Sequence, residues 1–218
     1  MKRLMSMTAA MLLLLALPLR AWAEGDGGKG TGSIFDLLAD SHIEYKADLV
    51  DYYLTEMYNA AVSGDVETGR AAQRNRDELI EREGSGQAVI AFDDLYLLSR
   101  LICSEAGCDW LSQDFRMCVG EVVMNRVASP EYPDTLREVV YQKGQYSTVS
   151  APGFESLVPT EECVDVALRL LRGERKMVES VVFQSNTIQG ELFTMYTDRT
   201  LGNTYFCLSE NQDLYPIG

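Results

Sequence analysis

The hydrophobic pattern of the chain changes period near residue 175, and this change constrains the fold more than any other feature. From residue 34 to 172, apolar residues recur every three or four positions, as on one face of a helix. Three short runs then follow, rich in β-branched and aromatic residues and separated by turn-forming residues: 181–184, 192–196 and 204–208. The sequence therefore predicts an α+β protein, mainly helical, with a small antiparallel β-sheet near its C-terminal end.

The first 23 residues have the three parts of a secretory signal peptide. Lys2 and Arg3 give a positive start, residues 5–17 form an apolar core, and Ala21-Trp22-Ala23 is a small-residue cleavage site. The apolar core is shorter than the roughly 20 residues that cross a bilayer. We therefore expect a secreted protein with no stable membrane insertion.

Glycine-rich segments divide the rest of the chain. Residues 24–33 contain five glycines and predict a flexible linker. Residues 34–86 predict a helical N-terminal region in which no pattern indicates catalysis, closed by Gly84-Ser85-Gly86. The domain expected to carry the chemistry spans 91–218. Its predicted helices, with Asp93 or Asp94 as the first N-cap, are 95–106, one opening at Asp114 and ending before Pro130, 134–143 and 160–172.

The chain is strongly acidic, with a net charge of −14. Removal of the signal peptide would remove Lys2, Arg3 and Arg20 and make the charge more negative. Such a protein is not expected to bind nucleic acid through a basic face. Binding of a substrate must then come from a shaped groove with stacking and hydrogen-bonding groups. The composition indicates no particular oligomeric state.

The five cysteines all lie in the C-terminal half: Cys103, Cys108, Cys118, Cys163 and Cys207. Export would permit disulfides, and an odd number leaves at least one thiol unpaired within a monomer. No Cys-x-x-Cys occurs and no histidine is near in sequence, so we expect no metal site. Disulfides and plain buried thiols both remain open.

The histidine count limits the possible chemistry. His42, in the N-terminal helical region, is the only histidine. Ser-His-Asp and Cys-His hydrolases need an imidazole beside the nucleophile, and a zinc amidase usually needs two or three histidine ligands. No phosphate-binding glycine loop is present, and we expect no cofactor. Carboxylates remain as the groups for hydrolytic chemistry.

Glu105 is the first candidate among the carboxylates. Cleavage of a glycosidic bond needs a carboxylic acid that is protonated near neutral pH, and burial favours the protonated form. Glu105 follows the apolar residues Leu98, Leu101 and Ile102 and precedes Ala106-Gly107, where the predicted helix ends. Because many glutamates near helix ends are solvated surface residues, this position alone makes Glu105 only a candidate.

Five blocks between Leu95 and Phe206 resemble the SleB/CwlJ-type cell wall hydrolases, the spore-cortex-lytic family, in order and spacing. The blocks are 98–106, ending in Glu105-Ala106; 120–127, ending in Asn125-Arg126-Val127; 132–141, with Pro133-Asp134-Thr135; 142–147, with Gly144-Gln145-Tyr146-Ser147; and the closing strands, with Phe183-Gln184-Ser185 and Gly202-Asn203-Thr204-Tyr205-Phe206.

The resemblance implies a lysozyme-like catalytic domain, associated with the cell wall, that cleaves the glycan strands of peptidoglycan with Glu105 as catalytic acid. Two departures put substrate contacts in doubt. The chain has Glu105-Ala106-Gly107-Cys108-Asp109 where the family usually has Glu-Ala-x-Gly-Glu, and Thr204 where it usually has histidine. We expect one wall of the groove to be formed by Gln145, Tyr146 and Ser147 and the opposite wall by Phe183, Asn203 and Tyr205. Tyr146 is either a sugar-stacking or a packing residue, and Asn203 either a binding or a turn residue.

One clearly placed acid favours a lytic transglycosylase, in which the muramyl C6 hydroxyl attacks its own anomeric carbon and no second carboxylate is needed. For muramidase-type hydrolysis, Asp109 or Glu121 is the candidate second acid. Two other functions remain open. One is an N-acetylmuramoyl-L-alanine amidase, which the lack of histidines disfavours, and the other is a non-catalytic peptidoglycan-binding protein of the same fold.

Overall fold

The computed structural model describes residues 34–81 and 89–215, with side chains from residue 49 onward. The predicted signal peptide, the linker at 24–33, the side chain of His42 and the boundary at 84–86 lie outside the described residues. The chain divides into two compact units, 1–43 and 44–218, and the packing described below is that of the second unit. Within the described ranges, no helix combines the length and the apolar character needed to cross a membrane.

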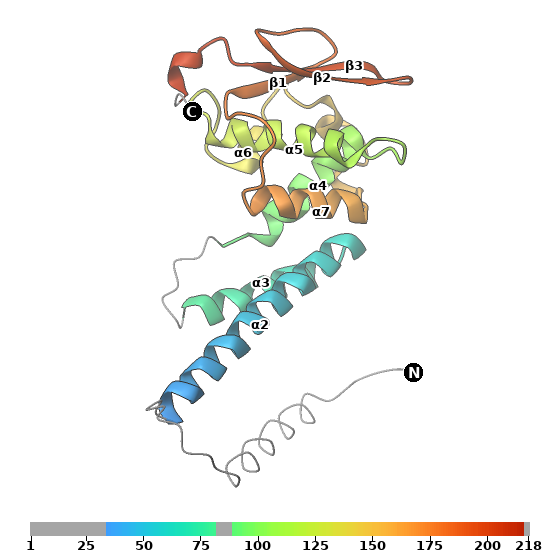
Figure 1. The fold of residues 1–218 in the computed structure, drawn as a ribbon. Coiled ribbons are helices and arrows are strands. Elements are labelled where there is room, and N and C mark those ends of the chain that lie inside the picture. Colours follow the sequence, from blue (N-terminus) through green and yellow to red (C-terminus); the bar gives the residue numbers. More distant parts are fainter. Residues whose placement is uncertain (1–33, 82–88, 216–218) are drawn as a thin grey trace. The chain divides into compact units, whose positions relative to one another are not determined.

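The described chain consists of helices followed by a small sheet, which confirms the predicted α+β class (Figure 1). The α-helices are α2 (Ile34–Ser63), α3 (Val66–Glu81), α4 (Phe92–Ala106), α5 (Gln113–Ala128), α6 (Leu136–Val140) and α7 (Glu161–Leu171). Short 3-10 helices are η1 (Ser147–Ser150), η2 (Phe154–Ser156) and η3 (Gln212–Leu214). The strands β1 (Val181–Ser185), β2 (Leu192–Asp198) and β3 (Gly202–Leu208) form an antiparallel sheet in the order β1-β3-β2.

Helix α4 forms the centre of the larger hydrophobic core. Its apolar residues face neighbours on nearly all sides, and Leu95, Leu98, Leu101 and Ile102 are fully buried. Helices α5 and α7 pack against it closely: a Cβ atom on Gly120 of α5 would lie 2.7 Å from Ile102 and 2.5 Å from Leu170 of α7. Burial on this scale is what drives the helix to form, because isolated helices of this length are marginal in water.

Two predicted helix boundaries were wrong. Ala91 is the N-cap of α4, whereas Asp93 and Asp94 lie inside its first turn. Acidic residues are common both at the N-cap and in the first turn of a helix, because a negative charge at either position interacts favourably with the positive end of the helix. Helix α6 is also shorter than the predicted 134–143, because Thr135 caps it by accepting a hydrogen bond from the Glu138 amide and turns follow Val140.

The predicted N-terminal helices pack onto α4 in this structure. Met57, Ala60, Ala61 and Ala72 belong to the same core cluster as the α4 residues. Gly69 of α3 lies so close to the Phe92 ring that an added Cβ would approach it to 2.1 Å. The core therefore continues from the α2–α3 pair into the domain that begins near residue 91.

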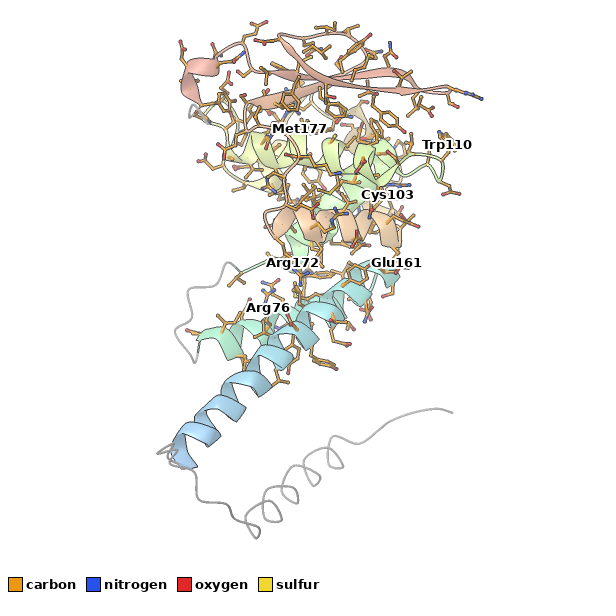
Figure 2. The ribbon with its side chains drawn as sticks, viewed as in Figure 1. Arg76, Cys103, Trp110, Glu161, Arg172 and Met177 are labelled. Carbon is orange, nitrogen blue, oxygen red and sulfur yellow. The ribbon has the colours of Figure 1, made fainter. Side chains whose placement is uncertain are left out.

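A second, smaller core lies between α5 and the sheet. The Phe115 ring stacks on Tyr196 with centroids 4.4 Å apart and meets Phe206 edge-on at 6.1 Å. Met177 belongs to the same cluster and lies between α5 and the sheet (Figure 2). The strand register places Gln184, Phe206 and Thr194 side by side on the face toward α5. Successive residues of a strand alternate between faces, so their neighbours in the sequence belong to the other face.

Candidate active site

The C-terminal end of α4, which carries Glu105, is held by the guanidinium of Arg116 from α5. Arg116 is 6% exposed and donates hydrogen bonds to the carbonyl oxygens of Ala106 (3.1 Å), Cys108 (3.0 Å) and Leu111 (2.9 Å). The last carbonyls of a helix have no partner within the helix and need one from elsewhere. Arg116 supplies these partners and so fixes the backbone next to Glu105.

Glu105 is partly buried and contacts the 3-10 helix η1. Its carboxylate oxygen Oε1 accepts a short hydrogen bond from the hydroxyl of Thr148. The Ser104 hydroxyl lies 3.3 Å from the same Thr148 oxygen and 2.8 Å from the Leu101 carbonyl oxygen. The candidate acid is therefore not a freely rotating surface carboxylate, because one of its oxygens is held by a side chain of another segment.

Tyr146 is buried at the start of η1. The guanidinium carbon of Arg126 lies 5.2 Å from the centre of the Tyr146 ring and 5.1 Å from that of Tyr132. Burial raises the pKa of Tyr146 to about 12, against the opposing effect of Arg126 and with a further upward contribution from the negative charge of Glu105. The phenol is neutral at physiological pH. Its ring packs inside the protein, so it offers no open face for stacking on a sugar in this structure.

Two buried polar atoms near this point lack a well-formed hydrogen bond within the described residues: Arg126 Nη1 and the Tyr146 hydroxyl. Gln142 Oε1 and Gln184 Oε1 are in the same situation. Buried polar atoms are almost always paired with protein groups or with water.

Glu121 is fully buried and has a structural role. Its two carboxylate oxygens accept hydrogen bonds from the backbone amides of Lys176 (2.9 Å to each oxygen) and Met177 (2.7 Å). Asn125, one turn further along α5, donates to the carbonyl oxygens of Val178 (2.9 Å) and Val181 (3.0 Å). This face of α5 thus holds the segment that leads into β1, and Glu121 is not free to act as a second acid.

Asp109, the other predicted second acid, is exposed in the loop between α4 and α5. Gln145 and Ser147 are exposed on either side of the buried Tyr146. The structure therefore places these three polar side chains at the surface. Asp109 is close in sequence to Glu105, and Gln145 and Ser147 are close in sequence to Thr148. Their predicted roles stay predictions.

The three residues predicted for the opposite wall share one face of the sheet. In the strand register Tyr205 lies beside Ser185 and Met195, and Phe183 lies beside Cys207, on the face that points away from α5. Asn203 accepts a hydrogen bond from the Thr197 hydroxyl (2.9 Å) and lies 3.1 Å from the Tyr205 hydroxyl. The structure brings these three residues together on one face of the sheet, and their strand pairing and hydrogen bonds lie within the sheet.

Sequence reasoning missed Thr148 and Arg116. Thr148, which contacts Glu105, directly follows the block that ends at Ser147 and was not among the predicted residues. No local pattern marks Arg116 as the residue that caps α4, because a buried arginine with three carbonyl partners is recognised only from the tertiary structure. Gln184, on the sheet face toward α5, lies within one of the matching sequence blocks but was not predicted as a site residue.

All five cysteines are free thiols in this structure. A hydrogen bond with the Cys163 thiol of α7 lowers the pKa of Cys103 to about 6, and Cys103 lies on α4 where that helix approaches α7 (Figure 2). Burial, followed by the negative charge of Glu121, raises the pKa of Cys118 to about 11. Among residues 49–81 and 89–215, no group of three or more His, Cys, Asp or Glu side chains is placed to hold a metal ion.

Comparison with protein families identifies most of the region that surrounds this site. Residues 112–207, from the start of α5 to the end of β3, match the model of the family described as Cell Wall Hydrolase. This segment is a cell wall hydrolase domain of the SleB/CwlJ family. The match includes Glu121, Arg126, Tyr146 and Thr148, whereas Glu105 lies just before it. Neither the curated proteins nor the solved structures give a match, so the lysozyme-like character of this cell wall hydrolase stays a prediction.

Proposed function

We propose that this cell wall hydrolase is a secreted enzyme that cleaves the glycan strands of peptidoglycan, with Glu105 as its general acid and base. Its family supports peptidoglycan as the substrate. The observation that carries the finer proposal is the difference between two neighbouring glutamates. Glu105 is partly buried with one oxygen held by a hydroxyl, whereas Glu121 is fully buried with both oxygens occupied by backbone amides.

The placement of Glu105 suits general acid catalysis. The side chain is partly buried at the C-terminal end of α4, next to the Thr148 hydroxyl. The carboxyl group also needs a fixed direction, since proton transfer requires the donor within hydrogen-bond distance of the leaving oxygen. The Arg116 contacts at the end of α4 and the Thr148 contact to the carboxylate supply this fixation.

A lytic transglycosylase reaction needs only this one carboxyl group. Glu105 donates its proton to the glycosidic oxygen as the bond from that oxygen to C1 of the muramyl residue breaks, and the leaving sugar departs with a free hydroxyl. The C6 hydroxyl of the same muramyl residue then bonds to C1 and gives its proton to Glu105. The product carries a 1,6-anhydro ring, and the carboxyl group is restored for the next cycle.

Hydrolysis by a muramidase mechanism would need a second carboxylate beside the scissile bond. A retaining pair has its carboxyl groups roughly 5–5.5 Å apart, and an inverting pair roughly 6.5–9.5 Å. Because Glu121 is occupied by the 176–177 backbone, the exposed Asp109 is the remaining predicted partner. The structural role of Glu121 thus favours the transglycosylase over hydrolysis.

Incubation of the full chain with purified peptidoglycan, followed by mass spectrometry, tests the proposal. Anhydro-muropeptides are expected; new reducing ends would indicate a muramidase or glucosaminidase, and free stem peptides an amidase. Glu105→Gln keeps the size of the side chain but cannot donate the proton, so the rate is expected to fall by about 10²–10⁴-fold. Asp109→Asn is the matched variant in the adjacent loop, and its activity separates the one-acid mechanism from the two-acid mechanism.

Full activity of Glu105→Gln would contradict the assignment of this residue. Binding of peptidoglycan without any product, by the unchanged chain as well as by the variant, would instead indicate a non-catalytic binding protein. A measurement of the melting temperature of each variant separates lost chemistry from lost folding.

A further inference from the structure

Thr148 is the side chain that meets the candidate acid from outside α4. It lies in η1, which is fixed at both ends. Before it, the Tyr146 ring is buried against Arg126. After it, the Ala151 amide donates to the Thr148 carbonyl oxygen at 3.1 Å and closes the turn. The position of the Thr148 hydroxyl is therefore set by packing of the loop, and Glu105 has to conform to it.

The number of hydrogens that the nearby hydroxyls can donate determines which oxygen of Glu105 can carry a proton. A threonine hydroxyl has one hydrogen to donate, and here it points to Oε1 of Glu105. The Ser104 hydroxyl also has a single hydrogen, which goes either to the Leu101 carbonyl oxygen at 2.8 Å or to Thr148 at 3.3 Å. As long as Thr148 donates to Oε1, this oxygen acts only as an acceptor in both arrangements. A proton on the carboxyl group must then be carried by the other oxygen, Oε2.

We propose that Thr148 is a positioning residue that reserves Oε1 of Glu105 and so leaves Oε2 as the oxygen that delivers the proton to the glycosidic oxygen. This inference rests on the proposed function of Glu105. During the reaction the hydrogen bond from Thr148 stays in place: it is accepted by the carbonyl oxygen of the protonated acid and by the carboxylate after proton transfer. The same geometry then places Oε2 to receive the proton of the attacking hydroxyl.

The expected size of the effect follows from the cost of poor alignment. Loss of the hydroxyl leaves the carboxyl group in place but free to rotate about its last torsion angle, which is a soft torsion. Misplacement of a reacting group by about 1 Å can reduce the rate by about 100-fold. A role that is only structural, as a tie between η1 and α4, would lower stability instead and would leave the rate per folded molecule unchanged.

The experiment compares Thr148→Val, which keeps the shape but lacks the hydroxyl, with Thr148→Ser, which keeps the hydroxyl. Ser150→Ala, an exposed position at the end of the same turn, is the matched control. With soluble uncrosslinked glycan strands as substrate, kcat of Thr148→Val is expected to fall about 10- to 100-fold with KM within about twofold. Thr148→Ser is expected to recover kcat to within about threefold of the unchanged chain.

The background of Glu105→Gln gives the deciding measurement. A residue that acts through Glu105 has nothing left to position there, so adding Thr148→Val to Glu105→Gln should not reduce the residual rate further. The inference is overturned if Thr148→Val retains more than half of kcat, if Thr148→Ser fails to recover it, or if the double variant loses rate additively. Full activity of Glu105→Gln would overturn the proposed function itself. An inactive Glu105→Gln together with an active Thr148→Val overturns only the role of Thr148.

Discussion

Glu105 and Glu121 lie on adjacent helices that pack against each other, yet the structure surrounds their carboxylates with different partners. Each follows a run of apolar residues on a buried helix. Glu121 lies near the middle of α5, where the amides of residues 176 and 177 occupy both of its oxygens. Glu105 lies at the end of α4, where the Thr148 hydroxyl donates a hydrogen bond to one of its oxygens. The partners of a carboxylate, rather than its burial alone, therefore decide whether it is available for proton transfer.

The charged side chains at the two sites also satisfy different backbone groups. At Glu121 a charged side chain satisfies backbone amides, which orders the entry to β1. At Glu105 a charged side chain, Arg116, satisfies backbone carbonyls, and within residues 49–81 and 89–215 the carboxylate accepts a hydrogen bond through Oε1. A substitution of Glu121 should therefore lower mainly the stability, and a substitution of Glu105 should lower mainly the activity.

The largest effect on stability is expected for Glu121→Ala. It removes the acceptor for the buried amide of Met177 and the partly buried amide of Lys176, and each unsatisfied group costs about 1–3 kcal/mol, so the free energy of unfolding should fall by about 4 kcal/mol. Chemical denaturation monitored by circular dichroism measures this change. The rate per folded molecule should stay near that of the unchanged chain.

Glu105→Gln is the paired control for Glu121→Ala, with the activity lost and the unfolding free energy nearly unchanged. If Glu121→Ala were stable and inactive, Glu121 would take part in catalysis and the contrast between the two glutamates would be false.

Arg116→Met is expected to have the next largest effect. Methionine fills much of the same volume but leaves the carbonyl oxygens of Ala106, Cys108 and Leu111 without the partner seen here. A loss of about 3 kcal/mol in unfolding free energy is expected. Because these carbonyls hold the end of α4 beside Glu105, kcat of the folded fraction should also fall.

This combined effect distinguishes Arg116 from Glu121. Arg169→Met, which removes an arginine paired with Glu174 at the surface, is the control and should change stability by about 1 kcal/mol or less. An Arg116→Met protein with reduced stability but an unchanged kcat would show that the end of α4 does not need this fixation for catalysis.

The contrast also explains what the sequence could and could not predict. The α4 helix and the position of Glu105 near its end follow from local periodicity, since the i, i+3, i+4 pattern is contained within a few turns. The contacts that define the two roles are not local. Thr148 is 43 residues from Glu105, and the amides bound by Glu121 are 55 and 56 residues away. Composition and spacing identify a carboxylate, but only the fold shows which of its oxygens are occupied.

The same limit applied to the loop after α6. The ordered blocks drew attention to residues 145–147, because polar and aromatic residues follow a turn there. Whether Tyr146 points inward or outward depends on Arg126, one helix away, and the structure buries the ring beneath that guanidinium. Thr148, two residues after Tyr146, then reaches the acid, and no sequence signal marks it because a threonine in a turn can also bond to nearby backbone groups.

The smallest effect on activity, but a sharp chemical readout, is expected from the two cysteines that flank the same helix pair. Thiolates react with iodoacetamide and thiols do not, so the rate of alkylation rises as the pH passes upward through the pKa. Cys103, whose pKa is lowered by the hydrogen bond with the Cys163 thiol, should reach half of its maximal rate at a lower pH than an ordinary thiol, whereas Cys118, with a pKa raised by burial to about 11, should remain slow at pH 7. Peptide mapping by mass spectrometry after timed alkylation between pH 5 and 9 measures both rates.

Cys163→Ser weakens the hydrogen bond that stabilises the Cys103 thiolate and should move the midpoint of Cys103 alkylation to higher pH. Equal rates for Cys103 and Cys118 at pH 7 would show that the partners of these thiols do not control their ionisation. The rule that partners decide the behaviour of an ionisable group would then fail for the cysteines of α4 and α5.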